Sequence, residues 1–107
     1  MAFQVLMTDD AERDIEDICR HVAAYDAIDR AAHILANLER TCRKLSIFPD
    51  RGNVPKELAR IGISDYREIH WKPCRIVYRI DGRRVLIYCV LDGRRDIRTL
   101  LQHRLLR

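Results

Sequence analysis

The chain has 107 residues, which suits one small domain with a single core, so we expect one domain spanning residues 1–107. Its hydrophobic fraction of 48% and charged fraction of 34% are typical of a globular protein, and no apolar run is long enough to span a membrane. The start of the chain lacks a basic segment followed by a long apolar one. We therefore expect a cytoplasmic protein with no membrane partner.

The formal net charge of +4 is distributed unevenly along the chain. Residues 1–65 hold 9 basic and 12 acidic side chains, whereas residues 66–107 hold 11 basic and 4 acidic ones. A positive potential over the second part would attract an acidic protein or a nucleic acid. The alternative is an ordinary solvated basic surface, because many small proteins carry this much charge.

The four cysteines are scattered, without a C-x-x-C pair, and two of them fall at the spacing of a helical core face. Buried, reduced thiols explain this pattern better than metal ligands or disulfides. We expect no metal site and no cofactor. The cysteines are Cys19, Cys42, Cys74 and Cys89.

The chain begins with a short apolar run over residues 3–7, which predicts a strand. Thr8 is placed to cap a helix, and acidic residues follow where the helix dipole favours negative charge. Apolar residues then recur every three or four positions, which indicates an amphipathic helix. This expected face consists of Ala11, Ile15, Ile18, Cys19 and Val22.

A second helix is predicted to begin near Asp26 and Asp29 and to end at about Ser46. Two consecutive helices with a short link form a hairpin, and its apolar side requires a sheet to pack on. The expected apolar face of the second helix is Ile28, Ala31, Leu35, Leu38, Cys42 and Leu45.

Turn residues fill 47–53, one helical turn is predicted at 55–58, and three strands with short connections then indicate an antiparallel meander. The last strand is apolar on both faces, which favours a central position in the sheet. The tail has leucines at helical spacing. We therefore predict an α+β fold, β-α-α-β-β-β-α, with an N-terminal helical hairpin on a small, mainly antiparallel sheet. The expected strands are 66–71, 75–80 and 85–91.

Along the second strand of the meander, alternation places two arginines on one face, which consists of Arg75, Val77 and Arg79, while the other face consists of Ile76, Tyr78 and Ile80. If Asp81 and Gly82 form a two-residue turn, Arg79 faces Arg84 and Arg75 faces Tyr88. Like charges on one face favour a bound anion, such as a phosphate or carboxylate. We expect a target-binding surface, without catalytic residues, that consists of Arg75, Arg79, Arg84, Tyr88, Arg94 and Arg95.

The ordered set of motifs resembles the ParE/RelE superfamily of toxins from bacterial type II toxin–antitoxin systems. The resemblance covers nearly the whole chain and is closer to the ParE branch than to the RelE branch. The fold that it implies agrees with the one predicted from periodicity. The motifs are TDDAERDI (8–15), LSIFPDRG (45–52), YRE (66–68), PCRIVY (73–78) and VLDGRRD (90–96).

The resemblance to the ParE branch implies a toxin that inhibits DNA gyrase and is not itself an enzyme. It also implies a cognate ParD-like antitoxin, acidic and partly disordered, that neutralises the toxin in a hetero-oligomer. Two alternatives stay open. One is a RelE-like, ribosome-dependent mRNA endonuclease, and the other is a non-toxic relic that only binds its antitoxin.

The endonuclease alternative can be compared with the sequence residue by residue. Arg75 and Arg95 match arginines that hold the phosphate in RelE-like toxins. The position of proton transfer falls on Leu101, whose side chain neither accepts nor donates a proton. The resemblance therefore implies an incomplete ribonuclease site.

Overall fold

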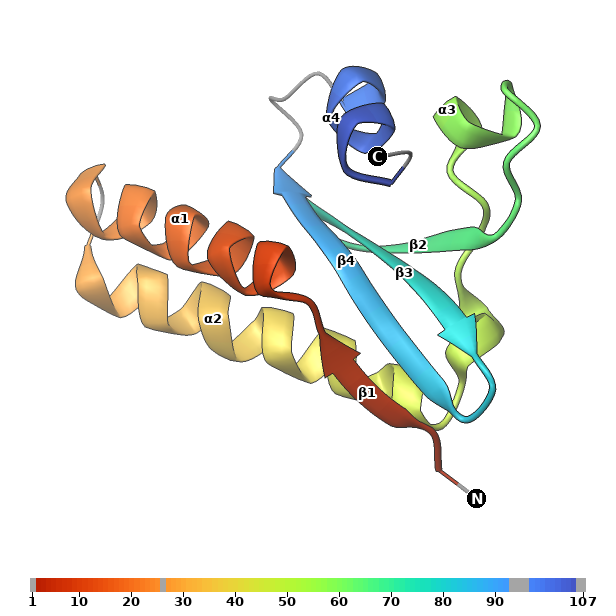
Figure 1. Cartoon of the computed structure of the whole chain (residues 1–107). Helices are drawn as coiled ribbons and strands as arrows, with labels where there is room; N and C mark the ends of the chain where they lie inside the picture. Colours follow the sequence, from red (N-terminus) through yellow and green to blue (C-terminus); the bar gives the residue numbers. More distant parts are fainter. Residues whose placement is uncertain (1, 26, 93–96, 106–107) are drawn as a thin grey trace.

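A computed structural model of the chain describes residues 2–25, 27–92 and 97–105. Two long helices lie beside a four-stranded sheet, and two shorter helices lie on its other side (Figure 1). The order of elements confirms the predicted α+β fold. The elements are β1 (Gln4–Met7), α1 (Asp9–Tyr25), α2 (Ile28–Arg43), the 3-10 turns η1 (Lys44–Ser46) and η2 (Pro49–Arg51), α3 (Lys56–Ala59), β2 (Tyr66–Trp71), β3 (Cys74–Asp81), β4 (Arg84–Asp92) and α4 (Ile97–Leu105).

The strands lie in the order β1-β4-β3-β2. Strands β2, β3 and β4 form the predicted antiparallel meander, and β1 pairs in parallel with β4. Strand β4 therefore has a neighbour on each side, which confirms the central position expected from its apolar residues. None of the helices in the described part of the chain is long and apolar enough to cross a membrane.

The start of α1 matches the sequence prediction. The backbone N–H of Ala11 donates to Thr8 Oγ1 at 3.2 Å, and the N–H of Glu12 donates to the Thr8 carbonyl at 3.0 Å. Asp9 and Asp10 occupy the first turn beside the free N–H groups. Thr8 is therefore the single residue between β1 and α1, and it caps the helix.

Both faces of the sheet are covered, each by its own apolar cluster. Alternate residues of β3 point to opposite sides, so Ile76 packs under α1 and α2 whereas Val77 packs under α3 and α4. Leu101 of α4 is fully buried in the second cluster. That cluster lies on the same face of the sheet as the arginines of β3.

The apolar face of α2 differs from the prediction at two positions. Ile28 is 77% exposed and Leu35 is 37% exposed, whereas Ile34 is buried in their place. The tip of the helical hairpin extends past the sheet in Figure 1, so the first turn of α2 has no strand beneath it. The expected acidic start at Asp26 lies outside the described residues.

The register between β3 and β4 also differs from the prediction. The turn begins at Gly82, whose φ of +60° suits glycine, so Asp81 pairs with Arg84 instead of lying in the turn. Arg79 consequently lies opposite Leu86. The expected pair of facing arginines is therefore wrong, because a turn displaced by one residue moves the partner of Arg79 by two residues, from Arg84 to Leu86.

A β-bulge in β4 changes the register a second time. Val77 lies opposite Cys89 and Tyr78 lies opposite Ile87, so Tyr88 is the extra residue between two pairs. The insertion reverses the alternation within the strand. Ile87 therefore joins the cluster under α1 and α2, and Cys89 joins the cluster under α3 and α4.

Candidate functional site

Arg75 is bound by two carboxylates of its own chain. It donates to Glu57 from Nη1 (2.9 Å) and Nη2 (3.0 Å), and to Glu68 from Nε (2.9 Å) and Nη2 (2.6 Å). Its side chain is only 14% exposed, and it lies opposite Leu91 instead of Tyr88. The expectation that Arg75 belongs to an open cationic surface is therefore wrong, because α3 and β2 both bring a glutamate to it.

The electrostatics of this cluster favour a structural role. Hydrogen bonds from Arg75 lower the pKa of Glu57 from its ordinary 4.5 to about 2, and the two carboxylates raise the pKa of Arg75. His70 Nε2 lies 2.8 Å from Glu68 Oε1 and adds a further partner to the buried carboxylate. The guanidinium therefore stays charged and is already paired twice within the protein.

Arg79 and Arg84 remain exposed near the end of the β3–β4 hairpin. They share a face of the sheet, because Arg79 lies two residues before Asp81, which is the partner of Arg84. Arg84 Nη2 lies 3.5 Å from Asp81 Oδ2, and both side chains are more than half exposed. A surface pair of this kind is weak, so a partner can compete for either arginine.

Tyr66 connects Arg79 to Tyr88. The guanidinium of Arg79 lies 6.0 Å from the centre of the Tyr66 ring, and Tyr88 meets that ring edge-on at 5.5 Å between ring centres. Tyr88 also lines a depression of about 400 Å³ beside Thr8 and Arg104. Tyr66 is buried, at 8% exposed, so it links Arg79 to Tyr88 by packing within the protein.

The structure does not describe two of the predicted target-binding residues. Arg94 and Arg95 lie outside the described residues. Arg79, Arg84 and Tyr88 stay predictions as target-binding residues, and Arg75 is set apart from them by its two glutamates. No group of three His, Cys, Asp or Glu side chains that could hold a metal ion occurs in the described ranges.

The turn formed by η2 and Gly52 is held in place by the buried side chain of Tyr78. The Tyr78 hydroxyl donates to the Pro49 carbonyl at 2.6 Å and accepts from the Gly52 N–H at 3.0 Å. A Cβ atom at Gly52 would lie 2.5 Å from the Glu68 carbonyl oxygen, so only glycine fits there. Arg67 donates to the carbonyl of Gly52 at 2.7 Å. This explains the Pro-Asp-Arg-Gly sequence as a rigid turn.

The sequence interpretation missed the glutamates that pair with Arg75. Glu68 lies opposite Val77 in the β2–β3 ladder, so it shares the face of Arg75, and this follows from the pairing of the strands. Glu57 had no comparable signal, because α3 is a four-residue helix whose position depends on packing.

Two findings relate this chain to known proteins by sequence. The family described as ParE toxin of type II toxin-antitoxin system, parDE, matches residues 5–97. The Caulobacter vibrioides protein named Toxin ParE3 is 30% identical over 94 residues, which cover 88% of this chain and 90% of that protein.

Two solved structures resemble the fold. A chain of the chromosomal ParDE toxin–antitoxin system of P. aeruginosa has a TM-score of 0.72 at 14% identity, with 85% of this chain and 96% of that chain covered. A chain of the RelBE2 toxin–antitoxin complex of Mycobacterium tuberculosis has a TM-score of 0.65 at 23% identity, with 86% and 99% covered. At these identities the likeness shows the shared fold.

Proposed function

This chain belongs to the ParE family of toxins of type II toxin–antitoxin systems, and on that basis we propose that it inhibits DNA gyrase by binding. The protein catalyses no reaction itself, and a cognate acidic antitoxin neutralises it by binding.

The observation that carries this proposal is the pair of exposed arginines on one face of the β3–β4 hairpin. Arg79 and Arg84 are exposed on paired strands, with Arg79 opposite Tyr66 of β2 and Arg84 opposite Gln4 of β1. The Arg79 guanidinium lies over the Tyr66 ring, which contacts Tyr88. Exposed guanidinium groups beside aromatic rings suit an acidic protein surface, because they combine charge pairing with apolar contact.

Two features favour binding over RNA cleavage. Arg75, the residue that a RelE-like site would use to hold phosphate, is paired with Glu57 and Glu68. Leu101, at the position of proton transfer, is fully buried in the apolar cluster under α3 and α4. A cleavage site here would need another proton carrier and a freed arginine.

The proposed antitoxin is an acidic, partly disordered ParD-like protein that covers exposed apolar surface of the toxin in a hetero-oligomer. Tyr25, Ile28 and Leu35 are exposed on the helical hairpin at 80%, 77% and 37%. Segments that fold on binding can bury such scattered residues along an extended path.

The test is supercoiling of relaxed plasmid by purified gyrase, with and without the protein. We expect inhibition that depends on protein concentration and is reversed by the antitoxin encoded beside it. Full supercoiling at every concentration would contradict the proposal. Two further assays separate the alternatives. Site-specific cuts within codons, seen by primer extension on translated mRNA, would favour the endonuclease. Normal growth on expression without the antitoxin would favour the non-toxic relic.

A further inference from the structure

Ile47 and Phe48 form an exposed apolar pair on the turn between η1 and η2, and we name these two residues the Phe48 knob. Ile47 is 68% exposed and Phe48 is 60% exposed, although both are large hydrophobic side chains. Two such neighbours in sequence form one patch, unlike the isolated apolar residues that any surface carries.

The backbone of the Phe48 knob is held by hydrogen bonds on both sides. The N–H groups of Ile47 and Phe48 donate to the Lys44 carbonyl at 3.3 and 3.2 Å, and the Arg51 N–H donates to the Phe48 carbonyl at 3.3 Å. The next residue, Pro49, accepts from the buried Tyr78 hydroxyl. A partner that binds the knob therefore loses little conformational entropy in ordering it.

Two cations, Lys44 and Arg51, and one acid, Asp50, lie close in sequence to the Phe48 knob, so its neighbourhood is net basic. The guanidinium of Arg51 lies 6.0 Å from the centre of the Phe48 ring, and Lys44 is exposed on the preceding turn. Phenylalanine and arginine are both enriched in protein–protein interfaces, and arginine is also enriched among the residues that dominate binding energy. The charge around the ring selects an acidic partner.

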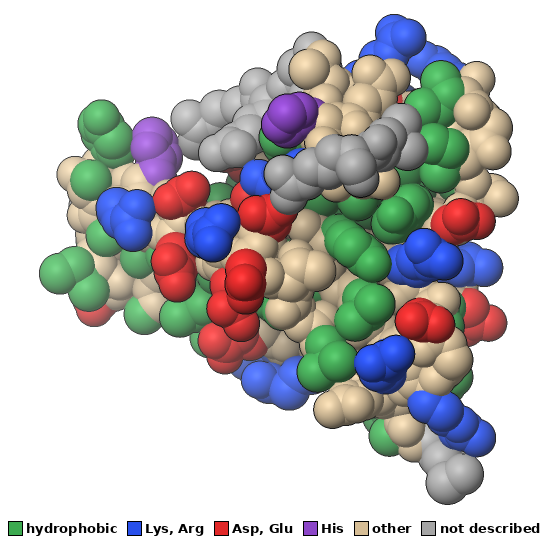
Figure 2. Space-filling model, in the orientation of Figure 1, with side chains coloured by type: hydrophobic (Ala, Val, Ile, Leu, Met, Phe, Trp, Pro, Cys, Tyr) green, Lys and Arg blue, Asp and Glu red, His purple; other side chains and the backbone are tan. Residues whose placement is uncertain are grey.

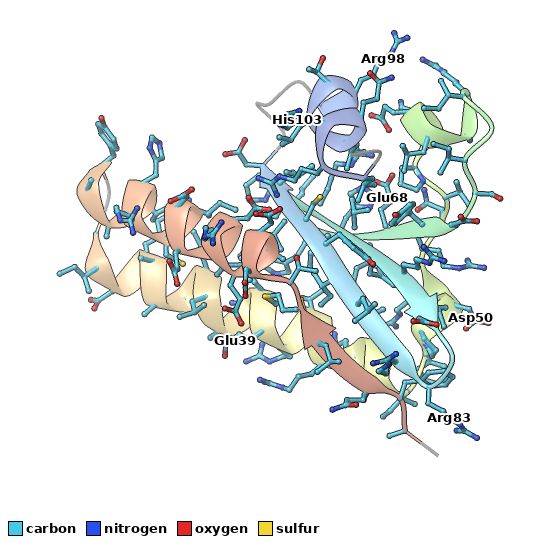
Figure 3. All side chains as sticks on the ribbon, viewed as in Figure 1. Glu39, Asp50, Glu68, Arg83, Arg98 and His103 are labelled. Atoms are coloured by element: carbon cyan, nitrogen blue, oxygen red, sulfur yellow. The ribbon has the colours of Figure 1, made fainter. Side chains whose placement is uncertain are left out.

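The Phe48 knob adjoins the hairpin that carries the exposed arginines. The Phe3 N–H donates to the Ser46 carbonyl at 2.7 Å, and the Gln4 N–H donates to the Arg83 carbonyl at 2.9 Å, so β1 links η1 to the β3–β4 turn. Figure 3 labels Asp50 of η2 and Arg83 of that turn at the same end of the molecule. Figure 2 shows basic and hydrophobic side chains side by side at that end, with acidic side chains among them.

We propose that the Phe48 knob is the apolar anchor of the toxin on its target and inserts into an apolar pocket rimmed by carboxylates. This inference rests on the proposed function, because it extends the target-binding surface of Arg79 and Arg84 along the same end of the molecule. Lys44, Arg51 and Arg83 pair with the acidic rim, and the ring of Phe48 fills the pocket.

The opposite end of the molecule suits an acidic target less well. Tyr25 and Ile28 are as exposed as the Phe48 knob, but Asp29 follows them, and red acidic side chains gather over the adjacent α1 in Figure 2. An acidic surface would be repelled there. The target therefore binds the Phe48 end and leaves the helical hairpin to the antitoxin.

The matched test compares two double variants, Ile47→Ala/Phe48→Ala and Tyr25→Ala/Ile28→Ala. Each replaces one exposed aromatic side chain and one exposed isoleucine, so the two variants make matched chemical changes. Two quantities are measured for each: the concentration that halves supercoiling by purified gyrase, and the Kd for the antitoxin. Urea unfolding confirms that both variants are folded.

We expect the knob variant to need about tenfold more protein or higher for half-inhibition, with its antitoxin Kd changed by less than about twofold. The hairpin-tip variant should inhibit gyrase within about twofold of wild type. Equal inhibition by the two variants would overturn the inference alone, and so would loss of antitoxin binding in the knob variant. A wild-type protein that leaves gyrase unaffected would overturn the proposed function, and this inference with it.

Discussion

Arg104 of α4 and Asp14 of α1 form a two-point ion pair, with Nη1–Oδ2 at 2.5 Å and Nη2–Oδ1 at 2.7 Å. Asp14 also accepts a hydrogen bond from the Val90 N–H at 3.0 Å, and its side chain is 4% exposed. One carboxylate thus joins the first helix, the central strand and the last helix. The contact fixes α4 over the sheet face that carries the arginines.

Asp14→Asn should destabilise the protein by about 2 to 4 kcal/mol, because it leaves the mostly enclosed Arg104 without a charged partner. The matched control is Asp17→Asn, which removes an exposed pair with Arg20 on the same helix and should cost less than about 1 kcal/mol. Urea unfolding at pH 7 measures both. Equal losses would show that Asp14 contributes no more than a surface charge.

Glu57→Gln should reduce the loss of folding stability that the protein shows when the pH is lowered. The folded-state pKa of Glu57 lies at about 2, below its ordinary 4.5, so its contribution is complete above pH 4.5 and disappears as the pH falls towards 2. The variant should be less stable than wild type at pH 6 and should lose less stability between pH 4.5 and 2. Urea midpoints across that range measure this, with the exposed Glu39→Gln as control; identical acid profiles for wild type and Glu57→Gln would contradict it.

Tyr78→Phe should destabilise the protein by about 1 to 3 kcal/mol, because the buried Gly52 N–H and Pro49 carbonyl lose their shared partner. Tyr25→Phe, on an 80% exposed side chain, should leave the thermal midpoint unchanged. Thermal unfolding followed by circular dichroism measures both variants. A Tyr78→Phe midpoint equal to wild type would show that water replaces the hydroxyl.

The four cysteines should react with iodoacetamide in a defined order at pH 8. Burial raises the pKa of Cys42 to about 12 and the pKa of Cys74 and Cys89 to about 11, whereas Cys19 is only partly buried. Cys19 should be alkylated first, and the other three only after unfolding in urea. Peptide mass spectrometry over time gives the rates, and labelling of Cys42 as fast as Cys19 would contradict the packing of α2.

Local sequence patterns predicted the helices and strands well, because these elements depend mainly on residues close together in the sequence. The cap at Thr8, the turn residues near Pro49 and the short strands all depend on neighbours in sequence. The central position of β4 also followed from its composition, since only a strand covered on both faces is apolar throughout.

The register and the ion pairs depend on contacts distant in sequence, and the patterns missed them. The turn at Gly82 shifts the pairing by two residues and the bulge at Tyr88 shifts it by one more, so the residue opposite Arg75 is Leu91 instead of Tyr88. Asp14 sits between Ala11 and Ile15 on the buried face of α1, so helical spacing did hold a signal for its burial. Its partner on α4 could be found only from the fold.

The most direct test of the account is gyrase inhibition by the charge-reversed variant Arg79→Glu/Arg84→Glu. Its control is Arg20→Glu/Arg40→Glu, which makes the same change in net charge on exposed arginines of α1 and α2. We predict that the hairpin variant needs about tenfold more protein or higher for half-inhibition, while the control stays within about twofold of wild type. Equal inhibition by the two variants would contradict the claim that Arg79 and Arg84 of the β3–β4 hairpin bind the target.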